Sequence, residues 1–223
     1  MSGPDPVTDP RLAPPHNPAT QTAVSEDPPR LILASASPRR QLLLREAGYH
    51  FIIHPANIDE ERYPVGYLPS DVAKFLAEAK ADAVAAQFPN DIILAADTVV
   101  AFGDRLLGKP RDAADAKRML ELLSGTTHIV ITGVAVQRKI ANFRKSARVM
   151  SAVRMRQLFP NEIARYVASN EWEGKAGGYG IQDADPFVTR VSGSHRNIVG
   201  LPMTVTIQLL SEAGIAPPTR EHI

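Results

Sequence analysis

One apolar run, 91-DIILAADTVVAF-102, constrains the fold of this chain more than any other stretch. Its aliphatic and β-branched residues are typical of a strand that is buried on both faces of a sheet. After the first residue, only Asp97 and Thr98 interrupt the run. A carboxylate inside such a strand is costly to bury unless it is paired or bound to a metal. We therefore expect a central strand that presents a functional acid to the ligand crevice of an open sheet, with a strand-ending cap as the alternative.

Around this strand the apolar pattern switches repeatedly between the periods of strands and helices. Ser37 can cap a helix that has Pro38 in its first turn, and Asp112 can cap another that Ser124 and Gly125 stop. We expect further strands at 31–36, 49–54, 128–136, 143–156 and 187–191, and helices at 38–48, 70–88, 112–123, 160–170 and 202–214. This alternation predicts a mixed α/β domain.

The chain divides into one domain and two tails. Residues 1–29 contain eight prolines and few large apolar residues, so they cannot bury enough surface to offset the entropy of ordering. We expect this segment to be a disordered tail, with a proline-rich docking segment as the alternative. Residues 30–216 are expected to form the folded domain, and residues 217–223 a C-terminal tail.

Composition excludes several classes of site. The chain has no cysteine, which rules out disulfides, thiolate zinc sites and cysteine nucleophiles. A net charge of +1 gives no general attraction to nucleic acid or acidic membranes, so any anion binding must be local. No apolar run approaches the ~20 residues that span a bilayer, and no signal-peptide pattern begins the chain. We expect a cytoplasmic, soluble protein that binds neither membranes nor nucleic acid.

The segment 35-SASPRR-40 is a candidate anion site. A serine-rich turn that leads into the first turn of a helix offers free backbone N–H groups, and Arg39 and Arg40 add permanently charged, planar donors suited to phosphate. Arginines at a helix start oppose the helix dipole, which favours a role in binding an anion. A solvated surface turn with two ordinary arginines is the alternative.

The run 174-GKAGGYGIQ-182 has the glycine density that lets a backbone approach a ligand closely. It fits neither the Walker A spacing nor the dinucleotide fingerprint, so a P-loop or Rossmann fold is not indicated. A flexible loop is the alternative, just as a solvent-facing turn lysine is for Lys109 in 107-LGKP-110. The remaining candidates are interpreted as surface or packing residues: His54, His128, His195 and Trp172.

Six motifs stand out in order along the chain: 33-LASASPRRQLL-43, 95-AADTVV-100, 107-LGKPRD-112, 124-SGTTHIVITGVAV-136, 175-KAGGYGIQ-182 and 197-NIVGLP-202. Together and in this order they resemble the Maf family of nucleoside triphosphate pyrophosphatases. The resemblance implies a Maf/Ham1-like (ITPase-like) α/β fold, with a mixed β-sheet flanked by helices and two lobes around a central cleft. It also implies hydrolysis of a nucleoside triphosphate to a monophosphate and pyrophosphate.

Site residues follow from the resemblance at matching positions. Asp97 matches the catalytic carboxylate of the family. Glu60, in 58-IDEE-61, falls where the family carries an acidic residue near the metal. Asp97 either accepts a proton from water or holds the metal, and the sequence leaves both roles open. The expected ion is Mg²⁺, or another divalent cation such as Mn²⁺, because only oxygen ligands are available. Substrate-binding roles are implied for Ser35, Arg39, Arg40, Lys80, Thr98, Lys109, Lys175 and Gln182.

Thr98 and Gln182 resemble the subgroup that cleaves dTTP and UTP, and Gln182 offers both a donor and an acceptor to a pyrimidine edge. Many relatives continue the glycine-rich run as IQG, whereas this chain reads 181-IQDADPF-187, with acidic residues at Asp183 and Asp185. These acids add negative charge near the expected base pocket. Three alternatives are a 7-methyl-GTP pyrophosphatase, a non-catalytic nucleotide-binding regulator of cell division, and a nucleic-acid-binding protein that uses the two arginines. A homodimer is compatible with the sequence, which does not determine the oligomeric state.

Overall fold

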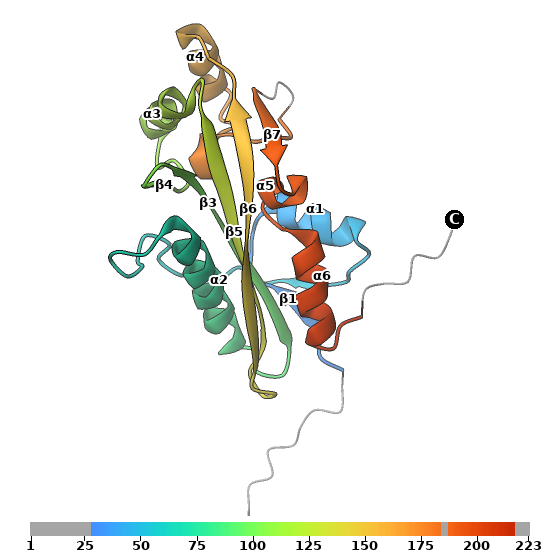
Figure 1. Cartoon of the computed structure of the whole chain (residues 1–223). Coiled ribbons are helices and arrows are strands. Elements are labelled where there is room, and N and C mark those ends of the chain that lie inside the picture. Colours follow the sequence, from blue (N-terminus) through green and yellow to red (C-terminus); the bar gives the residue numbers. More distant parts are fainter. Residues whose placement is uncertain (1–27, 184–186, 217–223) are drawn as a thin grey trace, which may run out of the picture.

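The computed structural model describes residues 28–183 and 187–216, so nearly all of the two expected tails, and Asp185, lie outside it. The described chain forms a seven-stranded mixed sheet in the order β2-β1-β3-β5-β6-β7, with β4 paired to β3 (Figure 1). Strands β1 and β3 are parallel, as are β1 and β2, and the remaining pairs are antiparallel. The strands are β1 Leu31–Leu33, β2 Ile52–Ile53, β3 Ile92–Phe102, β4 Arg105–Leu107, β5 Thr127–Arg138, β6 Phe143–Met155 and β7 Val188–Ser192.

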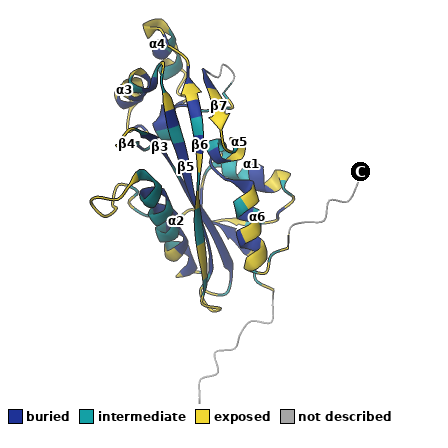
Figure 2. Cartoon of the chain, in the orientation of Figure 1, coloured by how far each residue is buried: buried dark blue, intermediate teal, exposed yellow. Residues whose placement is uncertain are grey.

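Helices cover both faces of one half of the sheet, which explains why β3 is apolar on both sides. Ile93 and Ala95 face α2 (Pro69–Ala85) and belong to its core cluster. Leu94 and Ala96 point the opposite way, into a core shared with α1 (Pro38–Glu46) and α6 (Met203–Glu212). Figure 2 shows the central strands as mostly buried between these layers, with the exposed residues on the outside. The expected central strand is confirmed.

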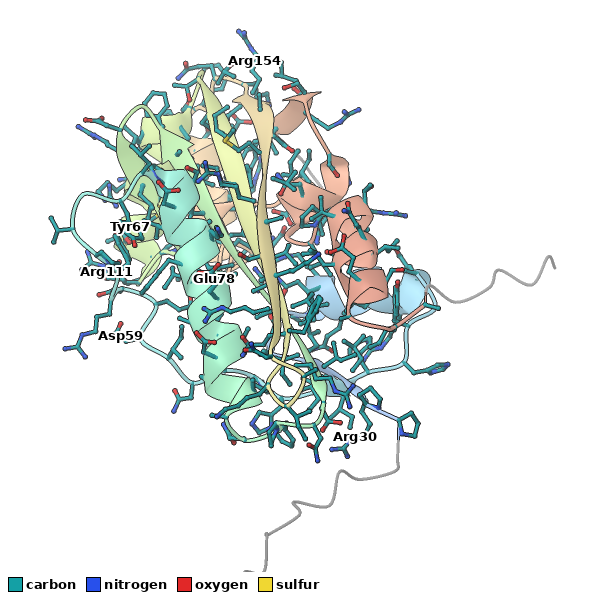
Figure 3. The ribbon with its side chains drawn as sticks, turned by 60° about the horizontal axis from the view of Figure 1, so that its bottom comes forward. Arg30, Asp59, Tyr67, Glu78, Arg111 and Arg154 are labelled. Atoms are coloured by element: carbon teal, nitrogen blue, oxygen red, sulfur yellow. The ribbon has the colours of Figure 1, made fainter. Side chains whose placement is uncertain are left out.

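The second half of the molecule has its own core. Helices α3 (Ala113–Leu123) and α4 (Pro160–Ala168) pack there with β4, β7 and the 3-10 turn η1 (Ala176–Gly178). Figure 1 shows α3 and α4 at the end of the long strands opposite α2 and α6, and Figure 3 places Arg154 and Arg30 at these two ends. The long strands β3, β5 and β6 therefore run through two lobes.

Close packing fixes α2 on the sheet. Gly133 of β5 pairs with Asp97 of β3, and a Cβ built on it would lie 2.2 Å from the carbonyl oxygen of Ala73. Only glycine allows the α2 backbone to approach this closely. On the outer side, Glu78 of α2 accepts a hydrogen bond from Ser146 of β6 at 2.5 Å (Figure 3). The helix is thus held at a fixed distance from the strand that carries Asp97.

One edge of β3 is open near its middle. Pairing with β1 ends at Leu33 and Leu94, where the Ala34 N–H donates to the Leu94 carbonyl at 2.8 Å. Pairing with β4 begins only at Val100 and Leu107. Between these points no strand of the described chain covers this edge of β3. Such a gap in an open sheet is where a ligand crevice forms.

Every predicted strand and helix is present; most are shorter than expected, whereas the strand expected at 128–136 extends over Thr127–Arg138. The strands expected at 31–36 and 49–54 reduce to Leu31–Leu33 and Ile52–Ile53. Asp112 caps α3 as expected, accepting from the Asp115 N–H at 2.7 Å. Ser37 occupies the cap position of α1 without a side-chain cap bond, which corrects its expected role. Three elements were not predicted: β4, η1 and α5 (His195–Val199). None of the described helices has the length and apolar character that spanning a bilayer requires.

Candidate active site

A cavity of about 370 Å³ lies at the open edge of β3, between the two lobes. Its walls come from the 34–40 turn, the 55–60 segment, α2, β3, the 174–182 run and α5. Every site residue that the sequence analysis proposes lines it: Ser35, Arg39, Arg40, Glu60, Lys80, Asp97, Thr98, Lys109, Lys175 and Gln182.

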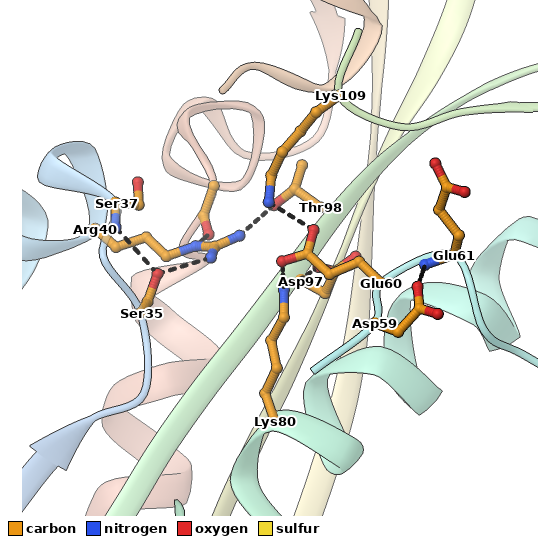
Figure 4. A network of polar contacts seen from close by, with 11 residues as sticks. Ser35, Ser37, Arg40, Asp59, Glu60, Glu61, Lys80, Asp97, Thr98 and Lys109 are labelled. Atoms are coloured by element: carbon orange, nitrogen blue, oxygen red, sulfur yellow. Dashed lines mark hydrogen bonds and ion pairs between the residues drawn. The ribbon is translucent and has the colours of Figure 1, made fainter. Parts of the chain in front are cut away.

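Arg40 anchors one wall of the cavity through its guanidinium group. It donates to Ser35 Oγ at 3.0 Å, to Thr98 Oγ1 at 3.1 Å and to the Gly200 carbonyl at 2.8 Å (Figure 4). These bonds join the turn before α1, the central strand β3 and the end of α5. Burial lowers the pKa of Arg40, whereas the nearby Asp97 raises it, and an arginine remains charged in either case. A fixed cation therefore faces the cavity.

Two lysines and two carboxylates form the opposite wall. Lys80 Nζ of α2 contacts Asp97 Oδ1 at 2.5 Å and Glu60 Oε1 at 2.8 Å. Lys109 Nζ contacts the other oxygen of Glu60, Oε2, at 2.5 Å (Figure 4). The side chains of Lys80 and Asp97 are each 6% exposed, so this pair is fully buried. The four charges balance, and Lys80 and Asp97 form the buried end of a network whose other members, Glu60 and Lys109, reach solvent.

The lysines determine the protonation of Glu60. Burial raises the pKa of this carboxyl group, but the charge of Lys80 and hydrogen bonds from Lys109 and Lys80 outweigh that effect and lower the pKa to about 2. Glu60 is therefore ionised throughout the physiological range. Because its two oxygens contact different lysines, Glu60 holds the 55–60 segment against both lobes of the molecule.

Asp97 and Thr98 are neighbours that point to opposite faces of the sheet, as successive strand residues do. Asp97 meets Lys80 on the α2 side, and Thr98 meets Arg40 on the α1 and α5 side. Both nevertheless line one cavity, because the edge of β3 is uncovered at this point. The open edge thus brings the arginine cluster and the buried acid together around one space.

Arg39, Lys175 and Gln182 lie on the outer wall. Arg39 Nη2 donates to the Gly174 carbonyl at 3.0 Å, which ties the first helix to the glycine-rich run. Lys175 Nζ forms an ion pair with Asp183, the residue where the sequence departs from the family pattern. Gln182 is exposed on the cavity wall, and its amide has no hydrogen-bond partner among the described residues.

Sequence reasoning missed a polar chain behind Arg40. Thr98 Oγ1 contacts Thr132 Oγ1 at 2.9 Å, and Thr132 donates to the Asn197 carbonyl at 3.1 Å. The Asn197 side chain is fully buried and donates to Val130 O at 3.1 Å and Ser151 Oγ at 2.9 Å. The motif 197–202 begins inside α5. The one available signal was the threonine in the apolar run 128–136.

The residues interpreted as packing residues occupy such positions. Trp172 is buried and donates from Nε1 to the Val167 carbonyl at 3.0 Å, and the His54 ring packs edge-on against Phe88. His128 is buried against Tyr179, and burial lowers its pKa to about 4. Within residues 28–183 and 187–216, no group of three or more His, Asp or Glu side chains could hold a metal.

Comparison with known proteins agrees with this geometry. The family model described as "Maf-like protein" matches residues 30–213. A dTTP/UTP pyrophosphatase of Cereibacter sphaeroides is 50% identical over 187 residues, covering 83% of this chain and 95% of the relative. A protein of the same name from Paramagnetospirillum magneticum is 48% identical, covering 84% and 98%.

A solved structure, that of the nucleoside-triphosphatase or dITP/XTP pyrophosphatase of Mycobacterium abscessus, can be matched to this chain. The match covers 85% of this chain and 100% of the solved one. At a TM-score of 0.40 and 13% identity, that likeness is too slight to bear on function. The sequence relatives, by contrast, match almost their entire length, and the family match spans both lobes and the cavity between them. On these grounds the chain belongs to the Maf family.

Proposed function

We propose that this chain is a nucleoside triphosphate pyrophosphatase that hydrolyses dTTP and UTP between the α and β phosphates. The names of its relatives support this proposal, since proteins 46–50% identical to it are called dTTP/UTP pyrophosphatases. One structural observation carries it: a buried carboxylate, Asp97, shares a cavity with the arginine cluster and Lys109. A site that only bound polyphosphate would gain little from an acid beside the phosphates.

The cationic groups would neutralise and position the polyphosphate. Arg40 is already fixed by three hydrogen bonds, so little further ordering is needed when it meets an anion. Arg39 and Lys109 lie on the same cavity and can approach a second and third phosphate. Ser35 adds a hydroxyl group at the turn before α1. Such preorganised charges favour the transition state most where water is excluded.

Asp97 would direct water onto the α phosphorus. Lys80 contacts only its Oδ1 atom, and Oδ2 has no hydrogen-bond partner in the described chain, so Oδ2 can accept the proton of the attacking water. The new bond joins the water oxygen to the α phosphorus, and the bond from that phosphorus to the bridging oxygen breaks. Pyrophosphate leaves with the bridging oxygen, and the nucleoside monophosphate keeps the oxygen from water.

The donor set fits a divalent cation such as Mg²⁺ or Mn²⁺. Glu60 and Asp97 both line the cavity, and one oxygen of each contacts the same lysine, Lys80 Nζ, at 2.8 and 2.5 Å. Mg²⁺ is commonly held by one or two carboxylates together with substrate phosphates, so Glu60 and Asp97 are the residues that would hold it. When bound, the ion would neutralise phosphate charge and lower the pKa of a coordinated water.

Thr98 and Gln182 receive different roles in this proposal. Thr98 Oγ1 is occupied by Arg40 and Thr132, so we assign it to holding Arg40 rather than to contacting the base. The Gln182 amide lies at the cavity wall without a hydrogen-bond partner among the described residues, and it can offer a donor and an acceptor to the O4 and N3 positions of thymine or uracil. Base selectivity is therefore placed at the end of the glycine-rich run.

An isotope experiment tests the reaction. Hydrolysis of dTTP in ¹⁸O-labelled water with Mg²⁺ should release pyrophosphate and place the label in dTMP, as mass spectrometry would show. Label in pyrophosphate or in free phosphate would refute attack on the α phosphorus. A parallel panel should rank dTTP and UTP above 7-methyl-GTP, and binding without turnover would favour the regulator instead.

The expected cytoplasmic location and homodimer remain predictions, which fractionation and light scattering would test.

A further inference from the structure

Asp183 closes the glycine-rich run into a loop through its buried carboxylate. Its Oδ2 accepts hydrogen bonds from Tyr166 Oη at 2.7 Å and from the Gly180 N–H at 2.8 Å, while Oδ1 pairs with Lys175 Nζ. The Asp183 side chain is 6% exposed and that of Lys175 is 13% exposed. Three donors therefore converge on one buried anion, a degree of saturation that a solvated loop carboxylate does not reach.

These contacts connect parts of the chain that would otherwise be independent. Tyr166 belongs to α4 and packs edge-on against Phe187, so it is fixed to the core of the second lobe. Lys175 and Gly180 are two points of the glycine-rich run itself. Asp183 thus holds this run to α4 immediately after Gln182. A glycine at this position would make none of these side-chain bonds.

The pairing also changes the interpretation of Lys175. This lysine lines the cavity, yet its ammonium group is held by an anion from the same loop. Asp183 also acts electrostatically on Arg39, whose pKa it raises against the lowering effect of burial. Lys109 also pairs with a carboxylate, that of Glu60, but it is 48% exposed against 13% for Lys175, and Arg40 faces the cavity from another wall. Lys109 and Arg40 are better placed to meet phosphate.

We infer that Asp183 is a positioning residue for base selectivity, which fixes Gln182 at the cavity wall and takes Lys175 as its counter-ion. The inference rests on the proposed function for the identity of the substrate. Its physical basis is that Gln182 can discriminate between bases only if the backbone that carries it is held at a fixed position on the cavity wall. Thymine and uracil present a C4 carbonyl and an N3–H, whereas cytosine presents an amino group and an unprotonated N3. A loosened Gln182 can rotate to satisfy either pattern.

Kinetics on dTTP and dCTP would test this role. Asp183→Asn keeps the side-chain volume but turns an amide N–H group toward one of the donors Tyr166, Lys175 or Gly180. Because this breaks a hydrogen bond that holds the run, we expect the ratio of kcat/KM for dTTP over dCTP to fall about tenfold. Lys175→Met should lower the ratio similarly, and the double variant should be no worse than either single variant, because both remove one unit. Glu171→Gln, an exposed carboxylate in the same region, is the matched control and should keep the wild-type ratio.

Tyr166→Phe provides an independent variant, since it removes one bond to Asp183 without altering a cavity residue. It should lower the same ratio by a smaller factor, and thermal melts would show that each variant is folded. Wild-type selectivity in Asp183→Asn and Tyr166→Phe would overturn the inference. An increase in KM for all triphosphates in Lys175→Met, additive with Asp183→Asn, would also overturn it by placing Lys175 on phosphate. If wild-type protein hydrolysed neither nucleotide, the proposed function would fail instead.

Discussion

Replacing Lys80 with methionine tests the buried charge network by removing one partner of a tight ion pair. Methionine approximates the length of lysine but removes the 2.5 Å contact of Asp97, whose side chain is only 6% exposed. Removing one member of a buried pair costs about 3–5 kcal/mol, because the remaining charge is uncompensated. For a chain of this size, that loss corresponds to a decrease in Tm of roughly 6–20 °C.

Lys74 offers a matched control on the same helix. It lies in α2, pairs only loosely with Glu78 at 3.8 Å and is 43% exposed, so Lys74→Met should cost less than about 1 kcal/mol. Urea unfolding at pH 7 gives the two free energies directly. Combining Lys80→Met with Asp97→Asn should restore part of the lost stability, because the stranded charge is gone. If Lys80→Met were no worse than Lys74→Met, or if the double variant were less stable than Lys80→Met alone, the reasoning would be refuted.

Three further predictions concern other parts of the site. Arg40→Lys should raise the KM for dTTP by about tenfold in initial-rate assays, because lysine cannot hold Ser35, Thr98 and Gly200 together; an unchanged KM would contradict this. Gly133→Ala should lower the urea midpoint by an amount equivalent to about 1–3 kcal/mol, because its Cβ would collide with the α2 backbone; unaltered stability would show that the helix moves freely. Glu60 has a folded-state pKa of about 2 against an ordinary value of 4.5, so its stabilising contribution is present above pH 4.5 and is lost as the pH falls toward 2. Unfolding titrations should therefore show a smaller loss of stability across this range in Glu60→Gln than in the wild type, and equal losses would count against the network.

Sequence alone predicted the parts of the fold that depend on local pattern. The apolar run of β3 and the Asp112 cap are encoded by neighbouring residues, and both are present in the structure. The interruption at Asp97 and Thr98 marked the site for the same reason, since polar residues in a buried strand require partners. The resemblance to a family placed the remaining candidate residues, all of which line the cavity.

The missing parts depend on contacts between distant segments. The open edge of β3 arises because β1 stops at Leu33, which is set by strand register rather than by the composition of either strand. Lys80 on a helix gives no sign of the acid 17 residues later that neutralises it. Likewise, the sequence could show that Asp183 departs from the family pattern, but not that Tyr166 and Lys175 donate hydrogen bonds to its carboxylate. Tertiary pairing of this kind is invisible to periodicity.

The proposed function requires that Arg39 and Arg40 bind a polyphosphate while Asp97 directs water onto its α phosphorus within the same cavity. Its most direct test measures Asp97→Asn twice, once for pyrophosphate release from dTTP and once, by calorimetry, for binding of a non-hydrolysable α,β-methylene analogue. We predict that turnover falls by about 10²–10⁴-fold while the Kd stays within a few-fold of the wild type. A variant that turns over at the wild-type rate, or that loses turnover and binding together, would contradict the claim.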